Sequence, residues 1–282
     1  MDTELARTFL AVVATGSFVE AAQRLYVTQS TVSSRIQRLE EELGAELFVR
    51  NKAGTTLTPA GRQFQRHASL LTRIVEQARQ EIGVSSGFRA TITVGCRIGL
   101  WENLLLRWLP LFARLAPDVA VRAVIGFEED LMSSLIEGRA DIGVMYTPQS
   151  RPGLTVEPLL DERLVMVSTQ PDPPKEPDSN YVYVDWGPEF FARHSLAFPN
   201  YAGSALTVNI GWLGLERILA YGGSGYFPLR LLHGHVLAGR LHRVAGAPEF
   251  RLPAYLCFAS GTLPAPVALA AETIRRVAAE AA

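Results

Sequence analysis

The pattern of apolar and polar residues is most regular over residues 17–44, where it predicts two short helices joined by a tight turn. Ser17 is a typical N-cap, and Glu20 three residues later completes a capping box, so the first helix should begin here. Thr28 offers a hydroxyl that can cap the second helix. One narrow apolar stripe predicts the buried face of the second helix. Its members are Val32, Ile36, Leu39 and Leu43.

The opposite side of this second helix carries short polar groups, where an ordinary surface helix would carry Glu and Lys. A row of Ser, Gln and Arg suits a helix that lies in the DNA major groove and hydrogen-bonds to base edges. The alternative is a packed helix pair of any small helical domain, whose polar residues merely face water. The pattern favours a helix-turn-helix. The polar residues of this side are Ser30, Ser33, Ser34, Gln37 and Arg38.

The residues after the second helix predict a two-stranded wing. Residues 48–49 face residues 56–57 across a turn at residues 53–54. Arg50 and Lys52 lie at its tip. Cations beside a recognition helix suit phosphate contact or insertion into the minor groove. A solvated loop that carries two charges is the alternative.

A long helix is predicted from Pro59, which Thr58 caps, to about Gly83. Its apolar residues repeat every 3.5 residues, which is typical of a coiled-coil seam. A seam this narrow indicates a dimerisation helix, and the alternative is packing on the protein's own second domain. The residues of the seam are Phe64, Ala68, Leu71, Val75, Ala78 and Ile82.

The remaining segments complete the outline. Residues 2–14 predict a helix that joins the core of the N-terminal module, and residues 83–87 predict a hinge-like linker. From residue 91 on, strands alternate with helices, including a continuous helix over residues 101–115, which implies parallel sheets covered on both faces. About 190 residues are many for one such sheet, so the loop at residues 169–177 is a candidate crossing between two α/β lobes.

The run from Ala21 to Gly61, AAQRLYVTQSTVSSRIQRLEEELGAELFVRNKAGTTLTPAG, resembles the DNA-binding domain of the LysR-type transcriptional regulators. The similarity is close over roughly residues 1–85, and the rest of the chain fits the family's effector domain more loosely. Ser30 stands where Pro is common in the family, and Ser34 where Arg is common. Both lie on the predicted reading face, so these departures bear on the target sequence rather than on the fold.

The resemblance implies an α + α/β fold: an N-terminal winged helix-turn-helix, a long dimerisation helix and a C-terminal two-lobed α/β domain of periplasmic-binding-protein type. The two lobes would enclose a ligand cleft. The expected boundaries are 1–58 for the winged helix-turn-helix, 59–83 for the coiled-coil helix, 84–90 for the hinge and 91–282 for the effector-binding domain. Within this last domain, lobe I is expected at about 91–165 and 265–282, and lobe II at about 166–264.

Residues that follow the predicted strands are the candidates for this cleft, because ligands of open α/β sheets bind at the carboxyl ends of strands. Arg97 could pair with an anionic ligand, or it could form a salt bridge with Glu128 or Asp185 across the cleft. The candidate effector-binding residues are Arg97, Ile98, Gly99, Phe127, Glu128, Tyr146, Thr147, Asp185 and Trp186.

The composition and charge of the chain indicate where the protein acts and what it binds. The chain has 282 residues, a formal net charge of −1 and no apolar run near the roughly 20 residues that span a bilayer. Acidic residues precede the first apolar run, which is unlike a secretory signal, so we expect a cytoplasmic protein. Residues 21–67 contain seven basic and four acidic residues, and this local excess of positive charge supports a DNA-binding surface of modest size.

Other reactive residues do not form a recognisable site. Cys96 and Cys257 are expected to be buried thiols, with a redox-sensing pair as the alternative. His233 and His235 have no carboxylate or Cys at a zinc-like spacing, so we expect no metal and no cofactor beyond a small-molecule effector. No catalytic motif occurs, and we do not expect an enzyme.

The sequence therefore predicts a sequence-specific DNA-binding transcriptional regulator controlled by a small-molecule effector. The expected partners are partly palindromic double-stranded DNA, further copies of the chain in a homodimer or homotetramer, the effector and, as a further candidate, RNA polymerase. Two alternatives are a solute-binding protein whose helical module contacts a partner protein, and an enzyme with a DNA-binding appendage. The residues expected to contact DNA are Thr28, Gln29, Ser30, Ser33, Ser34, Arg35, Gln37, Arg38, Arg50 and Lys52.

Overall fold

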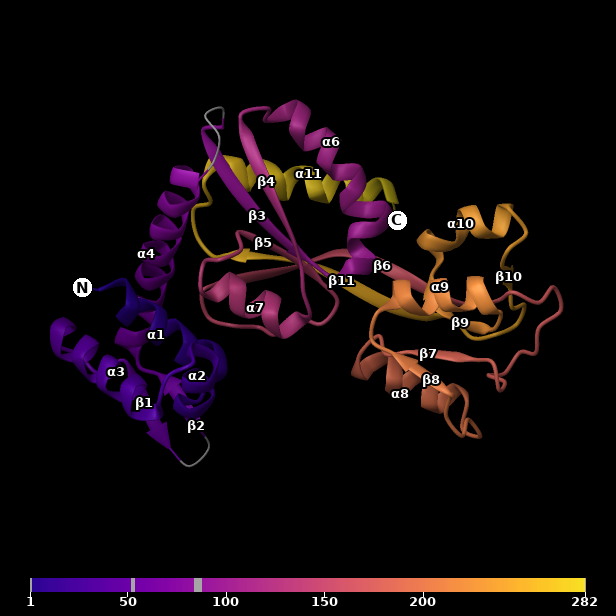
Figure 1. The fold of residues 1–282 in the computed structure, drawn as a ribbon, viewed down its shortest axis with the longest axis horizontal. Coiled ribbons are helices and arrows are strands. Elements are labelled where there is room, and N and C mark those ends of the chain that lie inside the picture. Colours follow the sequence, from indigo (N-terminus) through magenta and orange to yellow (C-terminus); the bar gives the residue numbers. More distant parts are fainter. Residues whose placement is uncertain (1, 52–53, 84–87, 282) are drawn as a thin grey trace.

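The computed structural model describes residues 2–51, 54–83 and 88–281. Its N-terminal unit is a helix-turn-helix with a two-stranded wing, followed by one long helix (Figure 1). The elements are α1 (Thr3–Thr15), α2 (Phe18–Leu25), α3 (Gln29–Leu43), β1 (Phe48–Asn51), β2 (Gly54–Leu57) and α4 (Pro59–Gly83).

The predicted helix starts and the wing are confirmed. The Ser17 hydroxyl accepts from the Glu20 amide at 3.3 Å, and the Thr28 hydroxyl accepts from the Thr31 amide at 3.2 Å, so both side chains cap the helices as expected. β1 and β2 pair in antiparallel register. The predicted stripe of α3 is wrong at its end, because Leu43 is 41% exposed in the last turn before the helix ends at Gly44.

The core of the N-terminal unit corrects part of the predicted dimerisation seam. Phe64 is buried, with its ring centroid 5.0 Å from that of Phe9 in α1, and Ala68 is fully buried in the same core. Leu71 packs against this core as well. The first half of the seam therefore covers the chain's own α1, since a narrow apolar stripe suits an internal partner as well as an external one. Val75 is half-buried and Ala78 is exposed, while the Ile82 side chain lies outside the described residues.

Gly61 allows α4 to start close against the turn before the wing. A Cβ atom at this position would overlap the Leu47 carbonyl oxygen and lie 2.8 Å from Leu57 Cδ2. We expect Gly61→Ala to reduce the free energy of unfolding by at least about 2 kcal/mol, because backbone cannot yield as a side chain can. Thermal unfolding of the full chain measures this loss. Gly234→Ala in α10, where nothing lies within 4 Å, is the control and should be neutral or stabilising. Equal melting temperatures for the two variants would contradict the prediction.

The C-terminal part of the chain forms two lobes (Figure 1). Lobe I contains β3 (Ala90–Cys96), α5 (Ile98–Leu100), the π-helical turn η1 (Trp101–Leu105), α6 (Leu106–Leu115), β4 (Val119–Ile125), α7 (Glu128–Ile136), β5 (Ile142–Met145) and α11 (Ala265–Ala281). Lobe II contains β7 (Val182–Val184), α8 (Pro188–Ala197), β8 (Leu206–Val208), α9 (Gly211–Tyr221), β9 (Ser224–Pro228), α10 (Leu229–Leu237) and β10 (His242–Arg243). Two long strands run through both lobes, β6 (Leu154–Ser168) and β11 (Phe250–Ala259).

These two strands make the crossing between the lobes. The start of β6 pairs with the end of β11 in lobe I, whereas residues 164–168 pair with β9 in lobe II. The predicted crossing at residues 169–177 is therefore wrong, and this loop belongs to lobe II. The sheet is also less parallel than predicted, because β3 runs parallel to β4 and β5 but β11 runs antiparallel to β5 and β6. Long-range pairing of this kind leaves no local pattern in the sequence.

The predicted continuous helix over residues 101–115 is broken at its start. Glu102 and Asn103 have non-helical backbone angles, with a φ of 55° at Asn103, and the regular helix α6 begins only at Leu106. Asn tolerates this left-handed conformation better than most residues. The break leaves the Glu102 carbonyl free to accept from Arg230 of lobe II.

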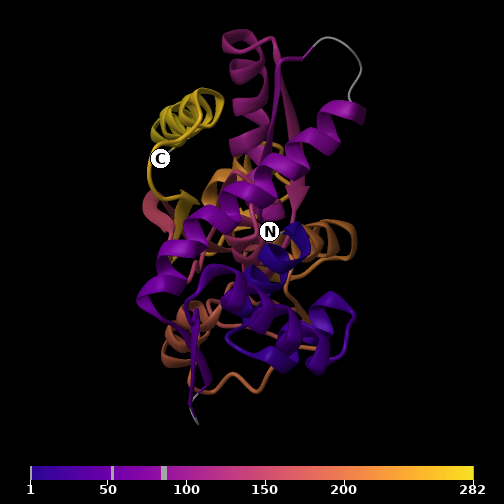
Figure 2. The same ribbon diagram turned by 90° about the vertical axis from the view of Figure 1, so that its left-hand side faces the viewer.

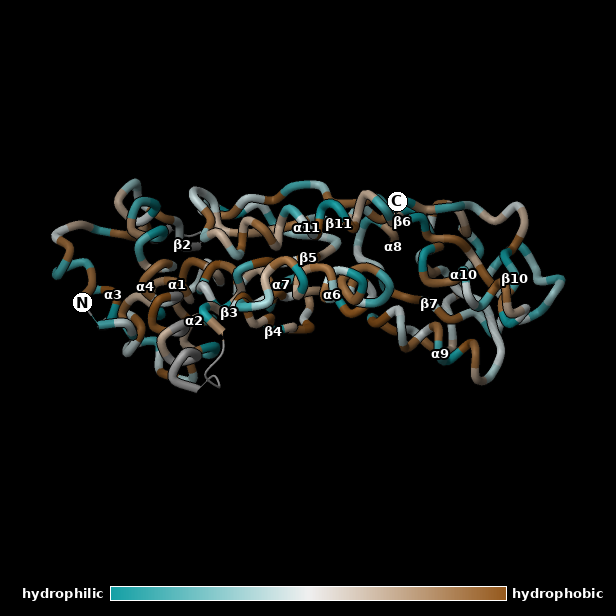
Figure 3. The backbone as a smooth tube through the Cα atoms, turned by 90° about the horizontal axis from the view of Figure 1, so that it is seen from above, coloured by the Kyte–Doolittle hydropathy of each residue, from teal (hydrophilic) through white to brown (hydrophobic). Residues whose placement is uncertain are grey.

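The three parts of the chain follow one another along the long axis, with lobe I in the middle (Figure 3). Figure 2 shows α4 running diagonally past lobe I. None of the helices in the described ranges is long and apolar enough to cross a membrane.

His194 lies in the aromatic core of lobe II and is 2% exposed. Its Nε2 is 2.9 Å from the Tyr181 hydroxyl, and burial lowers its pKa to about 4. The unfolded chain, with a His pKa near 6.5, binds more protons below that pH, so stability should fall as the pH drops from about 6.5 to about 4. The loss should reach about 2 kcal/mol at pH 4.5.

Calorimetric unfolding of His194→Gln between pH 7 and pH 4.5 tests this effect. The variant should lose less stability than the wild type over this range, whereas His233→Gln, which changes an exposed His of α10, should follow the wild type. An unchanged pH slope in His194→Gln would rule out this source of acid sensitivity.

Candidate nucleic-acid interface and effector cleft

The open face of α3 is the candidate DNA-reading surface. α3 lies on the side of the N-terminal unit that is turned away from lobe I (Figure 1). Because Val32, Ile36 and Leu39 are fully buried, the rotation of the helix about its axis is determined by the core. The predicted residues that remain exposed are Thr28, Gln29, Ser30, Ser34, Gln37 and Arg38.

The other predicted contacts of α3 differ in their exposure. Ser33 is half-buried at the edge of the face. Arg35 turns toward α1, where its Nη2 donates to Glu4 at 2.8 Å and its Nη1 to the Thr8 hydroxyl at 3.4 Å. Arg35 therefore has partners on α1 in this structure, and its predicted contact with DNA stays a prediction.

The charged and amide groups on the open face are held by weak local contacts. Arg38 pairs with Glu42 at 3.2 Å one turn along the helix, and Gln37 donates to Glu41 at 3.1 Å. Exposed pairs of this kind contribute little free energy, so both side chains can turn to DNA at small cost. In the wing, Arg50 belongs to β1, and Lys52 falls outside the described residues.

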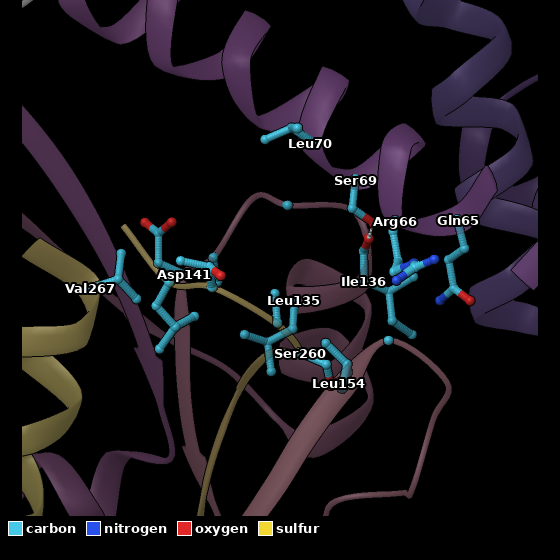
Figure 4. A pocket seen from close by; sticks show the side chains of 16 residues that line it. Gln65, Arg66, Ser69, Leu70, Leu135, Ile136, Asp141, Leu154, Ser260 and Val267 are labelled. Atoms are coloured by element: carbon cyan, nitrogen blue, oxygen red, sulfur yellow. Dashed lines mark hydrogen bonds between the residues drawn. The ribbon is translucent and has the colours of Figure 1, made fainter. Parts of the chain in front are cut away.

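The N-terminal unit docks on its own lobe I. Arg24 of α2 donates to the Ser133 hydroxyl at 2.7 Å and forms an ion pair with Glu137 at 3.1 Å. From α4, the Ser69 hydroxyl donates to the Ile136 carbonyl at 2.8 Å. Figure 4 shows Ser69 turned to Ile136 across a crevice of about 180 Å³ between α4 and lobe I. These contacts join the DNA-reading unit to α7 of lobe I.

Arg97 bridges the two lobes at the predicted effector cleft. Its side chain donates to the Asn209 carbonyl of lobe II at 3.0 Å and lies 3.5 Å from Glu128. Its guanidinium also stacks on the Phe127 ring, at 4.5 Å from the centroid. Of the two carboxylates considered for this arginine, Glu128 is the partner, since Asp185 accepts from the Gly187 amide instead.

A second buried arginine was not predicted. Arg230 of α10 pairs with Glu162 of β6 at 2.6 Å, and the two side chains are 9% and 2% exposed. Arg230 also donates to the Gly99 carbonyl at 2.9 Å and to the Glu102 carbonyl. It therefore fastens lobe II to the loop after β3. Sequence patterns could not identify this pair, because the two residues are 68 positions apart.

The remaining predicted cleft residues fall into two groups. Tyr146 and Trp186 are buried and meet edge to face at 6.0 Å; the Tyr146 hydroxyl is 3.4 Å from Glu162, and the Trp186 indole donates to the Tyr226 carbonyl at 3.0 Å. These two are committed to packing. Phe127, Thr147 and Asp185 are exposed around them, and Ile98 is half-buried.

Among the described residues the cysteines are buried and the histidines belong to no metal-binding group. Cys96 and Cys257 are both buried free thiols, and burial raises the pKa of each, that of Cys257 to about 12. Such thiols are inert, which argues against redox sensing. No group of three His, Cys, Asp or Glu residues that could hold a metal ion occurs in the part of the chain that the structure describes.

Comparison with known proteins covers both halves of the chain. The family described as "Bacterial regulatory helix-turn-helix protein, lysR family" matches residues 3–62, and the "LysR substrate binding domain" matches residues 85–176. The HTH-type transcriptional regulator HdfR of Yersinia pestis (strain Pestoides F) is 30% identical over 239 residues, which are 81% of each chain.

Two full-length solved structures share the fold. LysG of Corynebacterium glutamicum, with bound effector Arg, superimposes with a TM-score of 0.59 at 19% identity over 99% of both chains. ArgP of Mycobacterium tuberculosis gives a TM-score of 0.58 at 24% identity over 99% of this chain and 97% of its own.

Proposed function

Because this chain belongs to the LysR family of bacterial helix-turn-helix transcriptional regulators, we propose that it reads DNA with the open face of α3. The observation that carries this proposal is the exposure of Ser30, Ser34 and Gln37 on a helix whose opposite side is fully buried. Short hydroxyl and amide side chains reach base edges without steric conflict. Gln29, Ser33 and Thr28 flank this face, and Arg38, Arg50 and Lys52 would contact phosphates or the minor groove.

Self-association would place two such helices on one DNA site. On α4, Leu70 is 45% and Ile74 is 54% exposed, and Ala78 continues this row one turn later. An exposed apolar row on a helix favours a partner helix. We propose that this row, with the half-buried Val75, forms the dimer contact in place of the seam that begins at Phe64. A symmetric dimer reads a partly palindromic site.

The cleft between the lobes would bind the effector. Arg97 is the guanidinium group that a small carboxylate ligand would engage, because its pair with Glu128 is 3.5 Å long and partly exposed, whereas Arg230 is already neutralised by Glu162. Binding between the lobes would change their mutual arrangement, and the contacts of Arg24 and Ser69 would transmit that change to α2 and α4. A coupling of about 1–3 kcal/mol is sufficient to change DNA occupancy severalfold or more.

The remaining parts of the proposal follow from this role. The proposed division is a DNA-binding unit at 1–58, α4 at 59–83 and an effector domain that begins with β3 at Ala90. The predicted hinge at 84–90 falls mostly on residues 84–87, which lie outside the described residues. The protein would act in the cytoplasm, without catalytic activity, and RNA polymerase is a candidate partner at the promoter.

A pull-down of genomic fragments with purified protein at about 0.15 M salt tests the proposal, because non-specific phosphate binding is weak there. We expect a few strongly enriched sites that share an interrupted dyad. Equal retention of all fragments would overturn specific recognition. It would support the alternative of a solute-binding protein that binds DNA regardless of its sequence.

A further inference from the structure

Lobe II holds a pocket of its own, whose lining residues all belong to this lobe. It has a volume of about 630 Å³ and lies between β7, α8 and the segment that leads into β8. This volume is ordinary for a small-molecule site. Of the residues predicted for the cleft, only Asp185 reaches it. The side chains that matter for its chemistry are Tyr183, Asp185, Phe191, His194 and Tyr201.

The walls of this lobe II pocket are aromatic. The Tyr183 and Tyr201 rings lie nearly parallel, with centroids 6.3 Å apart and an interplanar angle of 25°. Phe191 also lines the pocket and is 60% exposed. Faces of aromatic rings attract flat ring systems and organic cations.

Tyr183, which lines the pocket, carries a polar group that its neighbours cover. Its side chain is nine-tenths buried, and its hydroxyl has no hydrogen-bond partner among the described residues. A buried hydroxyl without a partner costs free energy, and a ligand that displaces its cover and supplies the missing hydrogen bond would recover this cost.

The charge of the pocket indicates the charge of the ligand that it can bind. Asp185 is exposed and is the single ionised side chain among the described residues that line the pocket; it keeps one oxygen 3.0 Å from the Gly187 amide. His194 stays neutral at physiological pH because burial lowers its pKa to about 4. With one carboxylate and no opposing cation in its lining, the pocket repels anions and attracts ammonium groups.

We propose that the lobe II pocket binds a small aromatic ammonium ion, with the ring against Tyr183, Phe191 and Tyr201 and the ammonium group facing Asp185. This site goes beyond the proposed function, because apart from Asp185 it uses none of the residues predicted for the effector cleft and takes a ligand of the opposite charge.

Titration calorimetry of the full chain with tyramine tests the proposal. We expect saturable binding with a Kd of about 1 mM or tighter. The comparison ligand is 3-(4-hydroxyphenyl)propionate, which has the same ring and a carboxylate in place of the ammonium group, and it should bind at least about tenfold more weakly. Absence of tyramine binding, or equal affinity for the two ligands, would overturn the proposal.

Three variants locate the site. Phe191→Ala and Asp185→Asn should each weaken tyramine about tenfold, and Tyr183→Phe about threefold. Tyr183→Phe should fold normally, since the lost hydroxyl has no partner. Asp172→Asn, which removes an equal charge from an exposed loop of lobe II, is the control and should bind as the wild type does. Unchanged affinity in both Phe191→Ala and Tyr183→Phe would place tyramine elsewhere and refute the site.

Discussion

Replacing Ser34 by glutamate should abolish specific DNA binding while the protein stays folded. Ser34 is exposed at the middle of the open face of α3 and takes no part in the core. A carboxylate there would meet phosphates and the acceptor-rich edges of bases, so we expect a loss of at least about 100-fold in affinity, or about 3 kcal/mol. Glutamate is a good helix former, which leaves α3 intact.

The measurement is fluorescence anisotropy at about 0.15 M salt on a fragment recovered in the pull-down. Ser150→Glu makes the same substitution on an exposed loop of lobe I and should keep the wild-type affinity. Circular dichroism confirms folding. If Ser34→Glu bound within about threefold of the wild type, α3 would not be the reading helix in this orientation.

Replacing Arg230 by methionine should produce the largest loss of stability in lobes I and II. The substitution leaves the Glu162 carboxylate, 2% exposed, without its counter-ion, and it removes the donors to the Gly99 and Glu102 carbonyls. Breaking a buried ion pair on one side costs about 3–5 kcal/mol, because an uncompensated charge remains in the interior.

Urea unfolding measured by circular dichroism quantifies this loss. Arg251→Met breaks an exposed pair with Asp161 and should cost at most about 1 kcal/mol. The double variant Glu162→Leu/Arg230→Met removes both charges and should regain most of the stability. Equal losses of unfolding free energy for Arg230→Met and Arg251→Met would show that the buried pair contributes no more to stability than the exposed pair.

Features governed by neighbouring residues could be predicted from the sequence. The caps at Ser17 and Thr28, the wing turn and the start of α4 at Pro59 depend on residues within a few positions of one another. The buried stripe of α3 also predicted which side of the helix is exposed, whereas the exposure of Leu43, the partial burial of Ser33 and the contact of Arg35 with Glu4 were missed.

Features that depend on pairing between distant residues could not be predicted from the sequence. The crossing between the lobes is made by β6 and β11, whose partners are far apart in the chain. The length of this part of the chain indicated two lobes, but it could not show where the chain crosses between them. The prediction that the seam on α4 is a dimer contact was wrong in its first half for a different reason. Its periodicity shows that one face is buried, but the identity of the covering element, here α1 at Phe9, is tertiary information.

The docking of the N-terminal unit on lobe I has a consequence for engineered chimeras. Arg24 and Ser69 find their partners at Ser133, Glu137 and Ile136, all in or just after α7. Consider a hybrid regulator that joins this N-terminal unit to the effector domain of a relative. It would keep DNA binding and ligand binding, but it would lose the contacts between α2, α4 and α7. Such a hybrid would bind its DNA and its ligand independently, and transplanting α7 together with the DNA-reading unit should restore communication.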